Sequence, residues 1–454
     1  MDGSIRAPHA PRALPRLTDP VRLGAREAKN RLYRAPVLEV APQGPEAGRI
    51  LARELGPSAA AGCGLVFQGA CLVTPRGGRS APGLLRVHER EFVLSLKPAV
   101  EEVKRHGALL LMQLGFGGLQ TMELWHHEYK ASHPGIETLA VSEPPWWFKA
   151  VGATPLLDLS TVRVMTESEM EELAEAFGRA AGFAAEAGYD GVHLAGANAS
   201  IFQQCWSPVF NRRTDSFGQD RHRFFRLVVR SIRRHTPQGF LLTTKIPAET
   251  EAPFFVRGAL RVEDGVAIAR VAQDEGVDAV VPVRVGVTRD QATARGHFPE
   301  LAWNDPRWQE GYRRTFGRHL ALVKAANRAA ARAIPYEPAW NARFCAAVKR
   351  AVDVPVLCEG GLRERPQMDR LLRDGFADMV GCARPFYAEP RLAWRLLHDE
   401  SSRALCESCN NCTIPQVTGA TGVCRTPAIL AERGRLAKQG AYGPREADTA
   451  SRDP

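Results

Sequence analysis

The chain has 454 residues, of which 44% are hydrophobic and 24% charged, a balance typical of a globular protein. Its formal net charge of +10 comes from basic residues spread along the chain without a run of five, so nucleic-acid binding is not expected. The longest apolar stretch, residues 108–114, is far shorter than the ~20 residues of a membrane helix, so no membrane span is expected.

Residues 1–20 are rich in proline and arginine and lack the apolar core of a secretory signal. We therefore predict a flexible N-terminal segment over residues 1–20 and a cytoplasmic protein. Of the ten cysteines, six stand singly in or near apolar segments and four are clustered near the C-terminus. This distribution favours a reducing compartment and one local cysteine site over a disulfide framework.

Eight short apolar runs, each ended by glycine, proline or polar residues, alternate with segments of helical period such as 169–187 and 262–275. The predicted strands cover residues 32–37, 64–68, 108–114, 189–194, 240–246, 277–283, 354–359 and 377–382. Eight strand-helix repeats predict an α/β fold, a (β/α)8 TIM barrel over residues 21–400. The alternative, a doubly wound sheet, would be expected to carry a glycine-rich turn after the first strand, which the segment 35–38 does not resemble.

Two segments exceed what a barrel needs, at about residues 115–164 after the third strand and about 284–340 after the sixth. Both leave the C-terminal ends of strands, the face on which such barrels build active sites. They are therefore candidate pocket walls or lids. The alternative is a surface excursion that packs its own aromatic side chains, and the sequence leaves both open.

Residues 401–454 form a cysteine-rich extension and a tail. The spacing Cys406-x2-Cys409-x2-Cys412-x11-Cys424 is typical of a metal site, because a short loop can supply three thiolates and the returning chain a fourth. A [4Fe–4S] cluster, a structural Zn²⁺ and unligated or paired cysteines all remain open. The fewer than thirty residues after Pro427 carry no nucleotide motif.

Six segments in chain order resemble the old yellow enzyme family, in particular its NADH:flavin oxidoreductase branch with the 2,4-dienoyl-CoA reductases. They are Asn-Arg-Leu-Tyr-Arg-Ala-Pro at 30–36, Gly-Leu-Val-Phe-Gln-Gly at 64–69, Met-Gln-Leu at 112–114, 188–192 with 207–215, 355–362 and 377–385. The resemblance implies an FMN-dependent oxidoreductase, with NAD(P)H as candidate electron donor. The iron-sulfur members of the family have three residues between the second and third cysteine and appended reductase domains, which are not expected here.

The resemblance also implies a cofactor site. Backbone after the first strand would lie against the flavin, a small residue would leave room for the ring, a glutamine would pair with its pyrimidine edge, and a cation would stabilise the reduced form. Lys245 stands where the family usually has arginine, so the charge is kept but the bidentate fork is lost. The phosphate is expected between two turns after the seventh and eighth strands. The cofactor residues are thus Ala35, Pro36, Val37, Leu38, Gly69, Gln113, Lys245, Gly360, Gly361, Ala383 and Arg384. Any one of them could serve a purely structural purpose, but together they favour a phosphate-bearing cofactor.

The pattern breaks after the fourth strand. The family has His-x-x-His or His-x-x-Asn followed by Gly-Tyr, where the pair binds the substrate and the tyrosine delivers a proton; here residues 195–200 retain only Asn198. Ser200 is too weakly acidic to replace the tyrosine. Strand alternation places His193 one layer deeper, where a core histidine is the simpler interpretation. We take Asn198, Ser200 and His193 as candidate catalytic residues, with His126, His127, His297 and Tyr312 as alternative acid-base groups on the excursions.

The sequence thus predicts an FMN-dependent oxidoreductase that acts on a small organic substrate by altered chemistry, such as dehydrogenation, reductive rearrangement or reduction with a different proton donor. The alternative is a catalytically reduced family member that binds a cofactor and serves as a partner or scaffold subunit. A separate electron-donor protein and a homo-oligomer are compatible with either function.

Overall fold

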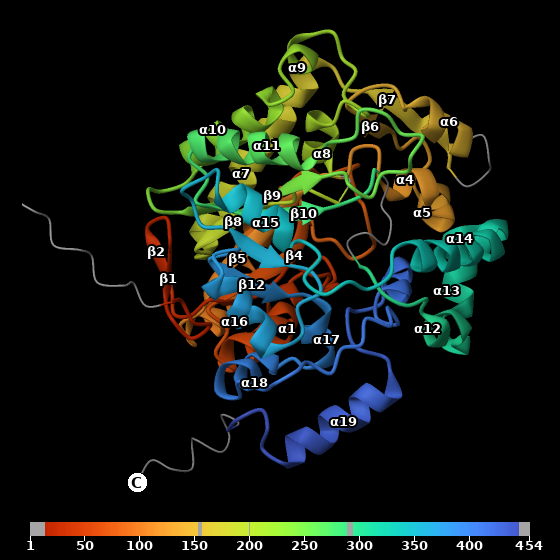
Figure 1. Cartoon of the computed structure of the whole chain (residues 1–454). Coiled ribbons are helices and arrows are strands. Elements are labelled where there is room, and N and C mark those ends of the chain that lie inside the picture. Colours follow the sequence, from red (N-terminus) through yellow and green to blue (C-terminus); the bar gives the residue numbers. More distant parts are fainter. Residues whose placement is uncertain (1–13, 153–156, 199, 288–293, 445–454) are drawn as a thin grey trace, which may run out of the picture.

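Eight parallel strands form a barrel in the computed structural model, which describes residues 14–152, 157–198, 200–287 and 294–444 (Figure 1). The strand order is β10-β9-β8-β5-β4-β3-β12-β11, and a parallel bridge between Val280 and Val356 joins the two ends. The strands are β3 (Leu32–Arg34), β4 (Leu65–Leu72), β5 (Leu109–Gly115), β8 (Gly191–Leu194), β9 (Leu241–Ala248), β10 (Ala279–Arg284), β11 (Leu357–Glu359) and β12 (Met379–Cys382). Each lies within or over one of the eight predicted runs, so the TIM-barrel prediction is confirmed.

The strand ends differ from the prediction for a local reason. β3 stops at Arg34, three residues before the predicted end, because Pro36 has no N–H to donate to a neighbouring strand. The chain leaves the barrel there and turns over its mouth. β9 instead continues two residues beyond its predicted end, to Ala248, and pairs with β10 along that length.

Helices on the outside of the barrel follow each strand. They are α1 (Ala47–Ala60), α2 (Arg90–Leu94), α3 (Lys97–Lys104), α7 (Glu167–Ala187), α8 (Ile201–Trp206), α9 (Ser216–Gln219), α10 (Arg223–His235), α11 (Val262–Asp274), α15 (Ala342–Lys349), α16 (Arg365–Arg373), α17 (Arg384–Ala388) and α18 (Leu392–His398). The longest, α7, begins with a capping box between Thr166 and Glu169 and ends at Gly188 in the left-handed conformation. Both ends of the helix are therefore encoded locally.

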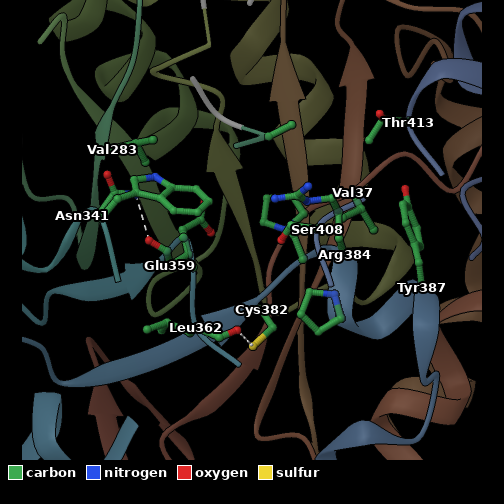
Figure 2. A pocket seen from close by; sticks show the side chains of 18 of the residues that line it. Val37, Val283, Asn341, Glu359, Leu362, Cys382, Arg384, Tyr387, Ser408 and Thr413 are labelled. Carbon is green, nitrogen blue, oxygen red and sulfur yellow. Dashed lines mark hydrogen bonds between the residues drawn. The ribbon is translucent and has the colours of Figure 1, made fainter. Parts of the chain in front are cut away.

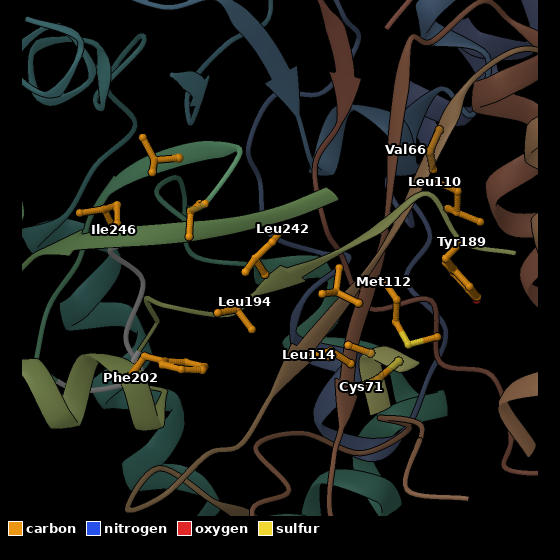
Figure 3. Close-up of a cluster of buried hydrophobic side chains, with 14 of the residues drawn as sticks. Val66, Cys71, Leu110, Met112, Leu114, Tyr189, Leu194, Phe202, Leu242 and Ile246 are labelled. Atoms are coloured by element: carbon orange, nitrogen blue, oxygen red, sulfur yellow. The ribbon is translucent and has the colours of Figure 1, made fainter. Parts of the chain in front are cut away.

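Strand alternation sorts the core into two layers. Leu110, Met112 and Leu114 of β5 point outward and pack with Leu194, Leu242 and Ile246 under the helices (Figure 3). Tyr33, Leu65, Phe67, Leu111, Leu241 and Leu357 point inward and fill the barrel. The barrel interior is thus a packed core, and a pocket has room only at the mouth.

The opposite end of the barrel is closed by the N-terminal hairpin of β1 (Val21–Leu23) and β2 (Arg26–Ala28), whose apolar side chains join the inner core. Residues 14–20 of the segment predicted to be flexible precede it. Leu17 is buried there, and its carbonyl accepts a hydrogen bond from the Arg31 amide at 2.9 Å. Residues 1–13 lie outside the described part of the chain.

The excursion after β5 contains α4 (Met122–Trp125), α5 (His127–Ser132), β6 (Thr138–Ala140), α6 (Trp146–Gly152), a 3-10 turn η1 (Leu159–Thr161) and β7 (Val162–Val164). Strands β6 and β7 pair with each other, and Trp147 and Phe148 pack with Phe210 in a small core of their own. The excursion after β10 carries α12 (Glu300–Asn304), α13 (Pro306–Phe316), η3 (Gly317–His319) and α14 (Leu320–Ala333), which project to one side of the barrel (Figure 1).

After α18 the chain forms a loop with the four clustered cysteines, a 3-10 turn η4 (Ile414–Thr418) and α19 (Pro427–Lys438). The loop lies at the barrel mouth, and α19 follows it at the edge of the molecule in Figure 1, where Arg433 donates to the Ala388 carbonyl of α17 at 3.2 Å. Tyr442 ties the end of this extension to the barrel, because its hydroxyl donates to the buried Glu389 carboxylate at 2.9 Å. Among the helices of the described ranges, none combines the length and the apolar character that crossing a bilayer requires.

Candidate functional site

A pocket of about 210 Å³, partly open to solvent, lies at the C-terminal ends of the barrel strands. Figure 2 shows Asn341 and Glu359 on one side of it and Arg384, Ser408 and Tyr387 on the other. Predicted cofactor residues from four strand ends meet here with one predicted catalytic residue, and the set is Pro36, Val37, Leu38, Asn198, Lys245, Gly360, Gly361, Ala383 and Arg384. The site predicted from the sequence is therefore largely one place in space.

Lys245 reaches the pocket from β9, and its ammonium group donates to the Glu359 carboxylate at 2.7 Å. The two side chains are only 6% and 12% exposed. The other carboxylate oxygen of Glu359 is buried and has no hydrogen-bond partner among the described residues. The predicted cation is thus present, but a carboxylate that sequence reasoning did not single out balances its charge.

Gly360 and Gly361 form a turn that only glycine tolerates, with φ values of 101° and 70°. A Cβ on Gly360 would lie 2.6 Å from the Trp340 ring, and one on Gly361 would lie 2.3 Å from the Glu337 carbonyl. The end of the second excursion therefore packs against this turn. The Trp340 indole N–H is buried without a partner among the described residues and borders the pocket.

Two arginines border the same end of the pocket. Arg384, at the first position of α17, donates to the Asn410 side chain and, at 2.8 Å, to the Arg295 carbonyl. Arg363 donates to the Ser408 hydroxyl, and its guanidinium carbon lies 3.7 Å from the centre of the Tyr336 ring. Within the described residues neither guanidinium has a carboxylate partner, which leaves two uncompensated positive charges beside the glycine turn.

Three predicted cofactor residues lie outside the pocket. Ala35 is buried, and its backbone amide donates to the Cys382 carbonyl at 2.9 Å. Gly69 makes room for the backbone of the first-strand loop, since an added Cβ would lie 1.8 Å from the Val37 carbonyl oxygen. Gln113 points into the barrel beside His193, one layer below Gly115.

The candidate catalytic residues are divided between two levels. Asn198 borders the pocket in a left-handed conformation with φ 64°. Ser200 precedes α8, and its buried hydroxyl has no partner among the described residues. His193 is fully buried below the mouth, with Nδ1 2.8 Å from the Thr243 hydroxyl. Burial, and secondarily the Lys245 charge, hold the pKa of His193 well below its usual value, so the ring is neutral.

The alternative acid-base residues do not reach this pocket. The Tyr312 hydroxyl donates to the Ala302 carbonyl at 3.0 Å in a fully buried position, and His127 and His297 are exposed. His126 is buried, and its Nδ1 accepts from the Tyr129 amide at 3.2 Å. The described residues that line the pocket include none of these four and no other histidine.

One wall of the pocket joins the two ends of the chain. The Tyr387 hydroxyl donates to the Leu38 carbonyl at 2.8 Å, and the Gln416 amide donates to the same carbonyl at 3.2 Å and to the hydroxyl at 3.0 Å. Burial raises the pKa of Tyr387 well above its usual value. Tyr387 and Gln416 were not predicted, because neither carries a sequence signal beyond its residue type.

Cys406, Cys409, Cys412 and Cys424 are reduced and near one another. Burial raises the pKa of the Cys412 thiol to about 12, and the other three thiols act in the same direction. The Cys409 sulfur lies 3.1 Å from the Thr426 hydroxyl. However, within the described ranges no three histidine, cysteine or acidic side chains are arranged to hold a metal ion.

The pocket does fit a phosphate-bearing cofactor such as FMN. At one end stand a glycine turn and two arginines for which the described residues offer no carboxylate partner, an arrangement suited to a phosphate group. The unpartnered Trp340 N–H and Glu359 oxygen border the same cavity and offer a donor and an acceptor to a polar ring system.

Comparison with known proteins also points to a flavin-binding family. Residues 16–253 match the model of the NADH:flavin oxidoreductase / NADH oxidase family. A NADH oxidase of Thermoanaerobacter brockii is 24% identical over 361 residues, which cover 79% of this chain and 46% of that protein, so the chain spans about half the length of this relative. A 4,4'-dithiodibutanoate disulfide reductase of Rhodococcus erythropolis is 24% identical over 433 residues, or 93% of this chain and 98% of that protein.

Among solved structures, a complex of 2-naphthoyl-CoA reductase with 2-naphthoyl-CoA shares the fold at a TM-score of 0.69 and 16% identity. The match covers 94% of this chain and 58% of that one. The family match extends over more than half of the chain and includes the first five barrel strands. The chain therefore belongs to the NADH:flavin oxidoreductase / NADH oxidase family, whose members are flavin-dependent oxidoreductases.

Proposed function

We propose that the protein is an FMN-dependent oxidoreductase that acts on a small organic substrate. The observation that carries this proposal is the pocket at the barrel mouth, where Lys245, the Gly360-Gly361 turn and Arg384 meet. Bound FMN would supply hydride-transfer chemistry, and NAD(P)H is the candidate donor. A small-molecule substrate is supported by the match to the 4,4'-dithiodibutanoate disulfide reductase, which covers 93% of this chain and 98% of that protein.

Within this proposal each residue has a defined task. Arg384 and Arg363 would hold the phosphate beside the Gly360-Gly361 turn. Pro36 and Val37 would present backbone to the flavin. The Lys245 ammonium group would lie near the ring, where Glu359 moderates its charge and so limits how strongly a reduced, anionic flavin is stabilised.

We further propose that the chemistry differs from ordinary reduction of activated alkenes, which needs a proton donor beside the substrate. The described pocket-lining residues include one tyrosine, Tyr387, and its hydroxyl already donates a hydrogen bond to the Leu38 carbonyl. Asn198 can orient a substrate but cannot donate a proton as a general acid. Dehydrogenation, reductive rearrangement or protonation by solvent is compatible with such a pocket.

The test is anaerobic purification followed by an absorption spectrum. Wild-type protein is expected to carry flavin that NAD(P)H or dithionite bleaches and that a substrate restores. Arg384→Ala should lower flavin occupancy strongly, while Arg328→Ala, which removes an exposed arginine of α14 paired with Glu300, should not. Protein that binds no flavin on titration would contradict the cofactor assignment. Flavin that is bound but never reduced would favour a cofactor-binding partner or scaffold subunit instead.

We also propose that Cys406, Cys409, Cys412 and Cys424 bind one metal centre, a [4Fe–4S] cluster or Zn²⁺. Their shared loop supports this, as does the influence of the other three thiols on the pKa of Cys412. Iron, sulfide and zinc analysis of anaerobically reconstituted protein tests it. Less than about 0.2 metal per chain would rule the site out, because a structural four-cysteine site is close to fully occupied.

A further inference from the structure

The loop between the clustered cysteines also touches the pocket. Ser408 stands between Cys406 and Cys409, and Asn410 stands between Cys409 and Cys412. Both are buried and both have left-handed backbone, with φ values of 56° and 60°. This conformation turns each side chain toward one of the two pocket arginines, Ser408 to Arg363 and Asn410 to Arg384.

The loop that carries these two residues is anchored to the second excursion. The His297 amide donates to the Ser408 carbonyl at 2.9 Å, and the Asn410 amide group donates to the Ala294 carbonyl at 2.9 Å and the His297 carbonyl at 3.2 Å. The neighbouring Arg295 carbonyl accepts from Arg384. The Arg384 guanidinium is therefore fixed between two segments that are themselves hydrogen-bonded to each other.

The chemical nature of these contacts separates the two arginines from the other cations nearby. Lys245 is paired with Glu359, and Arg295 is paired with Glu251 and Glu337 at 2.8 Å each, so carboxylates balance their charge. Ser408 and Asn410 instead offer neutral oxygens. Neutral acceptors orient a guanidinium and leave its charge available for an anion.

We infer that Ser408 and Asn410 are positioning residues of a phosphate-binding site formed by Arg363 and Arg384, so that the cysteine-rich loop is part of the cofactor site. The ligand is a phosphate monoester, and under the function proposed above it is the phosphate of FMN. The loop then determines how tightly FMN is distinguished from flavins that lack a phosphate. This role does not require a metal at the cysteines.

The experiment compares FMN with riboflavin, which lacks the phosphate, on flavin-stripped full-length protein. Flavin fluorescence is titrated for wild type, Ser408→Ala, Asn410→Ala and Asn410→Asp. Asn411→Ala is the matched control, because Asn411 is buried in the same loop but its side chain contacts Ala302 and Thr426 and neither arginine. Urea midpoints of all five proteins show whether a variant has lost its fold.

Asn410→Ala and Ser408→Ala should each weaken FMN binding about tenfold or more, the usual effect of losing a hydrogen bond to a charged group, and leave riboflavin binding unchanged. Asn410→Asp should weaken FMN more than Asn410→Ala does, because a carboxylate neutralises Arg384 and repels phosphate. Asn411→Ala should bind both flavins as wild type does. A purely structural role would instead make the aspartate variant the milder of the two at position 410.

Unchanged FMN affinity in Ser408→Ala and Asn410→Ala would overturn the inference. A loss of FMN affinity in Arg384→Ala in the same experiment would still support the proposed cofactor. Equal losses of FMN and riboflavin would also overturn it, since the loop would then support the fold in general. If wild type bound neither flavin, the proposed function would fail, and inorganic phosphate would decide the inference. If phosphate raises the urea midpoint of wild type but not of Asn410→Ala, the site is upheld. If phosphate affects both proteins equally, the inference is overturned.

Discussion

Replacing Lys245 by methionine leaves Glu359 without its partner. Breaking a buried ion pair from one side costs about 3–5 kcal/mol, because the remaining charge keeps its desolvation penalty. Both side chains are nearly buried, and the second Glu359 oxygen has no hydrogen-bond partner in the described part of the chain, which favours the upper end of this range. The carboxylate also borders a pocket of about 210 Å³, which is large enough to admit water. Since water would rehydrate the freed oxygen, we expect the lower end, about 3 kcal/mol.

The measurement is a double-mutant cycle with Lys245→Met, Glu359→Gln and the combined variant. Urea unfolding of flavin-free protein at neutral pH avoids stabilisation by the ligand. The combined variant should lose about 1 kcal/mol, so the two changes should couple by at least about 2 kcal/mol. The exposed pair of Lys149 and Glu143 is the control, with an expected loss below about 1 kcal/mol for Lys149→Met. Additive effects to within about 0.5 kcal/mol would refute the reasoning.

Three further expectations concern other parts of the molecule. Cyclohexenone should be reduced about 10²- to 10⁴-fold more slowly than by ordinary ene-reductases, because the described lining residues include no histidine and their one tyrosine, Tyr387, is hydrogen-bonded to Leu38. Cyclohexenone-dependent NADH oxidation under anaerobic conditions at the rate of ordinary ene-reductases would contradict this. Arg163 holds the pKa of Glu169 at about 2, so the stability it adds is present above about pH 4.5 and is lost as the pH falls toward 2. The Glu169 side chain is 34% exposed, so solvent screening reduces the effect, and Glu169→Gln should cost about 1 kcal/mol at neutral pH and almost nothing near pH 2. Urea midpoints measure this, and a difference that stays constant with pH would be inconsistent with the linkage. Gly69→Ala should destabilise by about 1–3 kcal/mol because its Cβ meets the Val37 carbonyl, whereas Gly434→Ala, which meets nothing, should be neutral or stabilising.

The barrel could be predicted because its strands and helices carry local signals. Each strand is a short apolar run with a terminator, and α7 has both its capping box and its final glycine written in the sequence. The exact strand ends depend on details that an apolar run does not carry: Pro36 ends β3 early, and pairing with β10 extends β9 beyond its predicted end.

The site was predictable where residues lie on strand ends and not where distant loops complete it. Lys245, the Gly360-Gly361 turn and Arg384 meet as expected because parallel strands bring their carboxyl ends together. Glu359 and Ser408 were missed for different reasons. A carboxylate beside a glycine pair carries no distinctive signal, and a serine between two cysteines has the appearance of a spacer.

The pocket wall in which Leu38 meets Tyr387 and Gln416 has a consequence for synthesis of the chain. Leu38 accepts its hydrogen bond from Gln416, 378 positions later in the chain. At the usual elongation rate of about 5–20 residues per second, the first-strand side of the pocket leaves the ribosome roughly 20–80 s before the segment that completes its wall. The barrel strands are all made before that segment emerges. Under the proposed function, FMN binding is therefore expected to follow release of the C-terminal loop that completes the pocket wall.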